Sequence, residues 1–182
     1  MIRPVDLGIC HGYEYDGDPA RTALVLPGSM LGGMPVLAFA IEAVTSTGRR
    51  AVLVWDEFLD SSQDMTEWVR ARLNAAATYA GEDGERLVIG KSLGTLAAGE
   101  AAERGWRAVW LTPLLNHPPF VEMLRRRTAP ALLIGGTNDP AWNGALAREL
   151  SDDVLELEGA DHGLAKIEHL APIVESIGAF LH

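Results

Sequence analysis

Cysteine is almost absent from this chain of 182 residues, in which Cys10 is the only one. A single cysteine excludes an internal disulfide bond, and the sequence therefore fits a reducing compartment. The next residue is His11, but neighbours on an extended strand point to opposite faces, so we interpret the pair as structural. The sequence also lacks an N-terminal signal pattern and an apolar run of membrane-spanning length. These absences predict a cytoplasmic protein without a membrane partner.

Basic residues are also scarce, with 15 lysines and arginines against 25 acidic residues and a formal net charge of −10. A nucleic-acid-binding protein presents a basic face to phosphates, so nucleic acid is not an expected partner. The only basic run, at residues 125–127, lies near an expected helix end, where arginines complement the helix dipole or remain in solvent. The acidic balance favours neutral substrates over anionic ones.

No repeat, low-complexity tract or linker divides the sequence, and an apolar content of 48% is enough for one domain with a sizeable core. Short apolar strand patterns alternate with helix patterns. This alternation is typical of a mostly parallel sheet with helices on both faces. We predict a single α/β domain over residues 1–182, with about six to seven strands joined by right-handed crossovers.

The strand patterns end at one predicted edge of the sheet. Strands are expected at residues 22–26, 51–55, 86–89, 108–111, 131–134 and 154–157, and helices at 35–46, 64–80, 92–104, 118–127, 142–150 and 167–181. Residues 3–16 are expected to add an antiparallel edge strand. Ligands of such sheets bind beyond the carboxyl ends of the strands, where the sequence has Pro27-Gly28-Ser29, Asp56, Ser92, Thr112, Asp139 and His162.

The sequence GKSLG at residues 90–94 lies between a β-branched run and an alanine-rich helix pattern. This is the context of a nucleophile elbow, a strained strand-to-helix turn that exposes a serine hydroxyl at its apex. Glycine at both flanks avoids collisions where the chain doubles back. Free N–H groups at the start of a helix also favour a developing negative charge. Ser92 is therefore the candidate nucleophile, although serine also caps helices well.

Asp139 and His162 each follow a later strand, which gives the order Ser, Asp, His. A serine hydroxyl needs a base to remove its proton, and the base needs a third group to orient it. We therefore predict His162 as the base and Asp139 as the acid. Asp161 is the alternative acid, but an immediate neighbour in sequence is poorly placed to hold the ring of His162. The structural interpretations are a helix cap or turn for Asp139 and an ordinary loop residue for His162.

Acyl transfer also needs donors for the oxyanion. The backbone N–H of Leu93, which follows the nucleophile, is one candidate. The second is expected from the glycine-rich loop at residues 27–33, with the N–H of Ser29 as first choice and that of Met30 as second.

The tripeptide at residues 90–92 also resembles the end of a phosphate-binding P-loop. A P-loop requires a glycine five residues before its Gly-Lys-Ser, but Glu85 occupies that position and Gly84 is one residue too far. Nucleotide hydrolysis is therefore disfavoured.

Over residues 20–182 the chain resembles the α/β-hydrolase superfamily, through GKSLG at 90–94, Asp139 and His162. It is most similar to the small, lidless, dienelactone-hydrolase-like members, because no long insertion follows the expected strand at 108–111. The resemblance implies a minimal α/β-hydrolase fold with Ser92 as nucleophile, Asp139 as acid and His162 as base. Two features depart from the pattern. Many members have His-Gly where this chain has Pro27-Gly28, and dienelactone hydrolases usually have cysteine as the nucleophile.

The expected function is hydrolysis of small carboxylic esters or thioesters, with an acyl-enzyme and without a metal or cofactor. A small acyl substrate is the expected partner, and the oligomeric state stays open. One alternative is a catalytically silent protein of the same fold that binds a small molecule or a protein, and another is hydrolysis of a peptide or carbon–carbon bond. Candidate pocket walls lie in the loops at the sheet edge, at Met30, Phe58, Leu93, Leu114, Leu115 and Trp142.

Overall fold

The computed structural model describes residues 1–29, 34–56, 64–81 and 83–182. Within these ranges, the strands form one eight-stranded sheet in the order β1-β2-β4-β3-β5-β6-β7-β8. From β3 to β8 all neighbouring strands are parallel. The strands are β1 (Ile2–Asp6), β2 (His11–Tyr15), β3 (Asp18–Leu26), β4 (Arg49–Trp55), β5 (Glu85–Lys91), β6 (Arg107–Leu111), β7 (Ala131–Gly136) and β8 (Asp153–Leu157).

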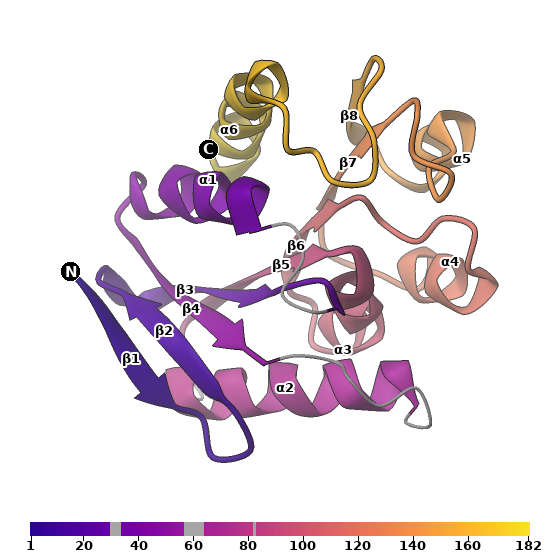
Figure 1. Cartoon of the computed structure of the whole chain (residues 1–182). Helices are drawn as coiled ribbons and strands as arrows, with labels where there is room; N and C mark the ends of the chain where they lie inside the picture. The colour runs from indigo at the N-terminus through magenta and orange to yellow at the C-terminus, as the bar shows by residue number, and fades with distance from the viewer. Residues whose placement is uncertain (30–33, 57–63, 82) are drawn as a thin grey trace.

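Helices cover both faces of the sheet (Figure 1). One face packs against α1 and α6, which also contact each other, and the other face packs against the remaining helices. The helices are α1 (Met34–Thr45), α2 (Met65–Ala80), α3 (Ala98–Glu103), α4 (Pro118–Arg125), α5 (Gly144–Leu150) and α6 (Ile167–Leu181). No helix in the described ranges has the length and apolar character needed to cross a bilayer. The α/β architecture expected from the sequence is confirmed.

The apolar strands build two cores because alternate residues point to opposite faces. On β5, Leu87 and Ile89 are fully buried in the layer of α1 and α6, whereas Val88 is buried on the other side. The continuous apolar runs of the central strands reflect this two-sided burial. β5 therefore lies deep in the sheet, and the residue that follows it emerges at the carboxyl edge.

Residues 3–16 lie at the edge of the sheet in antiparallel pairing, as expected, but the prediction of a single strand was wrong, since this segment forms a hairpin of β1 and β2. Gly8 has a φ of 86° in the turn, and the N–H of Leu7 bonds to the carbonyl of Cys10. The hairpin raises the strand count above the six to seven expected. Cys10 is buried in the turn, where burial raises the pKa of its thiol to about 11. A thiol of that kind is unreactive, which agrees with a structural role.

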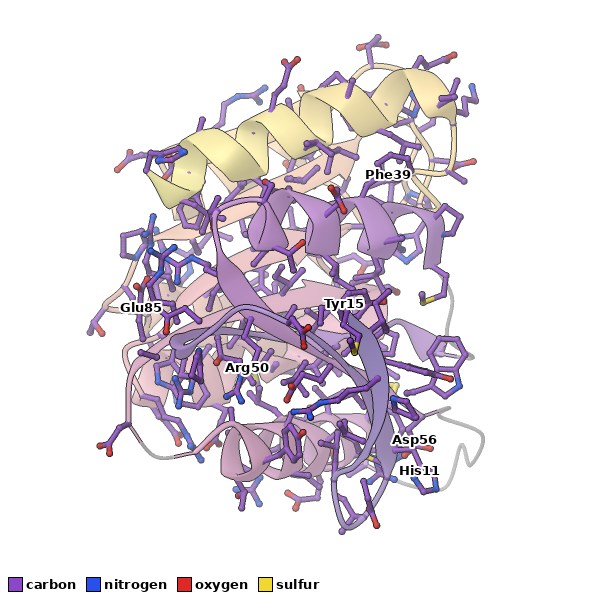
Figure 2. The ribbon with its side chains drawn as sticks, turned by 90° about the vertical axis from the view of Figure 1, so that its left-hand side faces the viewer. His11, Tyr15, Phe39, Arg50, Asp56 and Glu85 are labelled. Carbon is purple, nitrogen blue, oxygen red and sulfur yellow. The ribbon has the colours of Figure 1, made fainter. Side chains whose placement is uncertain are left out.

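Glu14 attaches the hairpin to the rest of the sheet. Its side chain is buried and accepts hydrogen bonds from Arg3 at 2.6 Å and from the hydroxyl of Tyr79 at 2.9 Å. Arg50 lies 3.7 Å from the same carboxylate and, in Figure 2, between the sheet and α2. At the other end of the hairpin, Figure 2 shows His11 beside Asp56, whose carboxylate pairs with Arg72 at 2.9 Å. Asp56, expected at the ligand-binding edge, therefore has an ionic partner on α2.

The interior of α6 contains a glycine that packing does not require. A β-carbon added at Gly178 would meet no atom within 4 Å. Glycine in a helix interior costs about 1 kcal/mol relative to alanine. We therefore expect Gly178→Ala to raise the free energy of unfolding by about 1 kcal/mol, measured by urea denaturation. A lower unfolding free energy would contradict the packing of α6 described above.

Candidate active site

Three segments at the carboxyl edge of the sheet bring Ser92, Asp139 and His162 together. Ser92 directly follows β5, Asp139 lies in the loop after β7, and His162 lies in the loop after β8. The Nε2 atom of His162 is 2.7 Å from the Oγ atom of Ser92. Its Nδ1 atom is 2.8 Å from the Oδ2 atom of Asp139. The imidazole ring therefore bridges the hydroxyl and the carboxylate, which is the arrangement of a catalytic triad.

The turn at Ser92 is strained and requires glycine on both sides. Ser92 has a φ of 51°, in the left-handed region that non-glycine residues rarely occupy. A β-carbon at Gly94 would lie 2.5 Å from the carbonyl oxygen of Leu26, and one at Gly90 would lie 2.6 Å from that of Gly94. Because Leu26 is the last residue of β3, the approach of Gly94 places the turn directly against the end of that strand. The helix expected from 92 to 104 is divided into a 3₁₀ segment, η2 (Ser92–Ala97), and α3.

Thr112 is a second strained residue at this edge. Its φ is 44°, and it directly follows β6. Because Lys91 pairs with Leu111 across β5 and β6, Thr112 and Ser92 leave neighbouring strands at the same level. Non-glycine residues in the left-handed region cluster at functional sites, where the surrounding structure holds the backbone in an unfavourable conformation.

The surroundings of Asp139 favour the ionised form of its carboxyl group. Its side chain has no exposed surface, and it accepts a hydrogen bond from the N–H of Ala141 at 2.9 Å. Burial by itself would raise its pKa, but the hydrogen bonds from His162 and Ala141 outweigh burial and hold the pKa below its usual value. An ionised acid next to Nδ1 favours the ring tautomer with its proton on that nitrogen, so that Nε2 can accept the serine proton.

Asp161, the alternative acid, has a different partner. Its side chain is exposed, and one carboxylate oxygen accepts the N–H of Gly163 at 2.9 Å. It closes the turn that carries His162, while Asp139 contacts the ring.

The structure describes two of the three predicted oxyanion donors. Leu93 is buried at the start of η2, and Ser29 is exposed in the loop after β3. Gly94 contacts the backbone of Leu26 and Pro27, so this loop approaches the elbow. Met30 lies outside the described residues. The assignment of Leu93 and Ser29 as donors stays a prediction.

The residues predicted to line the pocket differ in their burial and in their contacts. Leu114 is half-buried, whereas Leu115 is 5% exposed and belongs to the core under α4. The indole of Trp142 packs on Gly135 and donates a hydrogen bond to Glu156 at 2.7 Å. Leu115 and Trp142 thus have structural partners. Phe58, like Met30, lies outside the described residues, so the pocket stays a prediction.

Lys91 also lies at the site, and the sequence did not predict this. In the sequence, this lysine stood out only as part of the tripeptide at residues 90–92 that resembles a P-loop. The side chain is 3% exposed, and its Nζ atom donates a hydrogen bond to the backbone carbonyl of His162 at 2.8 Å. Burial lowers the pKa of Lys91 to about 8, although Asp139 and Asp161 act in the opposite direction. A lysine at the last position of a buried strand was the signal that could have revealed it.

A metal site needs several ligating groups close together. In the part of the chain that the structure describes, no three histidine, cysteine, aspartate or glutamate side chains gather to hold an ion.

No protein-family model and no curated protein matches this sequence. Solved structures nevertheless share its fold. An alpha-beta serine hydrolase homologue from Coxiella burnetii has a TM-score of 0.74 at 15% identity, over 100% of this chain and 97% of that one. Est1E from Butyrivibrio proteoclasticus has a TM-score of 0.78 at 13% identity, over 99% and 97%. The esterase domain of a Rhodothermus marinus protein has a TM-score of 0.72 at 17% identity, over 99% and 97%. The expected α/β-hydrolase fold is confirmed.

Gly94→Ala tests the close approach of η2 to the end of β3. The added methyl group would be forced against the carbonyl oxygens of Leu26 and Pro27. We expect the free energy of unfolding to fall by about 3 kcal/mol, measured by urea denaturation. Gly178→Ala is the matched control, because the same change there meets open space. Equal stability of the two variants would be inconsistent with the close approach at Gly94.

The depressed pKa of Lys91 predicts how stability depends on pH. Between pH 8 and pH 10.5, the native lysine has lost its proton while the unfolded one still holds it. The unfolded state then binds more protons, so stability must rise with pH in this range, by up to about 3 kcal/mol. Denaturation at pH 7.5 and 10.5 should show this gain for the unmodified protein relative to Lys91→Met. A parallel pH dependence of the two proteins would contradict the buried ammonium.

Proposed function

We propose that this chain, which has the α/β-hydrolase fold, is a serine hydrolase of small carboxylic esters or thioesters. The observation that carries the proposal is the continuous contact from Ser92 through His162 to Asp139, at 2.7 Å and 2.8 Å. A serine that only caps a helix has no need of a histidine at hydrogen-bond distance with a buried carboxylate behind it.

The geometry supports a two-step reaction. As the Oγ atom of Ser92 attacks the acyl carbonyl, the Nε2 atom of His162 takes the hydroxyl proton, and the imidazolium is stabilised by Asp139. The carbonyl oxygen becomes an oxyanion that the N–H groups of Leu93 and Ser29 are proposed to bind. The imidazolium then gives its proton to the departing alcohol or thiol, which leaves an acyl-enzyme.

Water completes the cycle. The neutral His162 removes a proton from a water molecule as its oxygen attacks the acyl-enzyme, and the second oxyanion collapses with return of the proton to Ser92. The products are the free acid and the alcohol or thiol. The side chain of His162 is 38% exposed, so it lies within reach of solvent water.

One observation bears on the size of the substrate and another on its charge. β6 and α4 are separated only by residues 112–117, which leaves no length for a helical lid at that position. The formal charge of −10 also disfavours anionic substrates. Among the solved structures of similar fold, Est1E was also solved with bound ferulic acid. Others of this fold are described as lipolytic enzymes. These descriptions concern those proteins, and they agree with acyl chemistry at this edge of the sheet.

A fluorophosphonate probe tests the proposal directly. The Ser92 oxygen should displace fluoride from phosphorus, and the intact mass should rise by one phosphonyl group. Ser92→Ala and His162→Ala should remove the adduct, since one lacks the nucleophile and the other lacks the base. Asp139→Asn should slow labelling by about 10³- to 10⁴-fold, because an amide cannot stabilise the imidazolium.

The outcome separates an enzyme from a silent relative. A single adduct that depends on Ser92 and His162 would support the proposal and justify a screen of short-chain esters and acyl thioesters. A folded protein that takes up no probe would contradict it and favour a binding function for the same fold.

A further inference from the structure

Lys91 lies under the loop that carries His162. It is the last residue of β5, and alternation along the strand puts its side chain on the same face as Leu87 and Ile89. That face also buries Ala160 and Leu164, which flank His162 in the loop after β8. The lysine is therefore enclosed between the strand that presents the nucleophile and the loop that presents the base.

The hydrogen bond from Lys91 holds the backbone of His162 itself. The first part of this loop is tied to the loop after β7, where the N–H of Asn138 bonds to the carbonyl of Ala160 at 3.0 Å. Gly159 makes a further bond to the hydroxyl of Thr137 at 2.8 Å. In the described ranges, the carbonyl of His162 has Lys91 as its hydrogen-bond donor, at 2.8 Å. Without that donor, the ring of His162 would be held by its side-chain bonds and by the bonds of neighbouring loop residues, with no bond to its own carbonyl.

A lysine is a costly choice for this position. Removing an ammonium from water is unfavourable, and a methionine of similar length would fill the same space without that cost. The charged groups that act on Lys91 are Asp139, from the loop after β7, and Asp161, from the loop after β8. Both are acidic, and both belong to the loops that form the triad. The charge of Lys91 thus attracts the two loops toward the end of β5.

We propose that Lys91 is a positioning residue, whose ammonium fixes the backbone of His162 so that the ring stays between Ser92 and Asp139. This inference rests on the proposed function for its effect on rate. Lys91 acts through His162 and is not proposed to contact the substrate. Displacement of a reacting group by about 1 Å can lower a rate about 100-fold, so a single backbone contact can matter.

Lys91→Met removes the donor and keeps the length of the side chain. The second-order rate constant for fluorophosphonate labelling and kcat for an ester should both fall about 10- to 100-fold. KM should stay within about twofold, because Lys91 is not proposed to contact the substrate. Lys91→Arg keeps a charged donor and should recover most of the labelling rate.

Lys166 supplies the matched control. It is the other lysine of the chain and lies in the same loop, but its side chain is exposed. Lys166→Met should label and turn over at the rate of the unmodified protein. Should Lys91→Met fail to fold, Lys91→Gln replaces it, and its shorter neutral amide should still slow labelling relative to Lys91→Arg. Labelling of a folded Lys91→Met or Lys91→Gln at the unmodified rate would overturn the proposal.

A spectroscopic measurement reports ring position without any reaction. The Nδ1 proton of His162, bonded to Asp139, should give a proton NMR signal far downfield of the amides, assigned by its loss in His162→Ala. In Lys91→Met this signal should shift or broaden, whereas Lys166→Met should leave it unchanged. An unmodified protein that shows the signal but takes up no probe would contradict the hydrolase proposal alone. An unchanged signal in Lys91→Met, with normal labelling, would contradict the role of Lys91 alone.

Discussion

The approach of Gly94 to the carbonyl oxygens of Leu26 and Pro27 is the contact on which the site depends. It places the start of η2 against the end of β3, directly after the reversal of the chain at Ser92, whose φ is 51°. The same contact brings the loop after β3, with its proposed oxyanion donor at Ser29, next to the elbow. A side chain at residue 94 would separate these parts, so one backbone contact positions both Ser92 and the loop that carries Ser29.

His162, the proposed base, needs a different kind of support, because it lies in a loop and not at a strand end. Its ring is held by Ser92 and by the buried Asp139, and its carbonyl is held by Lys91. Two of these three partners are consecutive residues at the junction of β5 and η2. The strand that leads into Ser92 therefore also holds the backbone of His162.

The central strands were predictable because burial on both faces leaves continuous apolar runs, as in Leu87, Val88 and Ile89. The N-terminal hairpin was not, since its strands are short and half-exposed and its turn depends on the positive φ of Gly8. For the candidate site, motif and strand order selected Ser92, Asp139 and His162, and the structure brings these three together. The sequence disfavoured Asp161 because an immediate neighbour is poorly placed to hold the ring of His162, and in the structure its carboxylate accepts the N–H of Gly163.

The sequence by itself determined the α/β alternation, the glycine-flanked serine and the order of the three polar residues, because each follows from local pattern and spacing. The tertiary structure decided the hydrogen bond from Lys91 to His162, the burial of Asp139, and the structural contacts of Leu115 and Trp142. These features depend on which loops meet across the sheet. Lys91 and His162 are 71 residues apart in the chain, and only the folded sheet brings the ammonium of one to the carbonyl of the other.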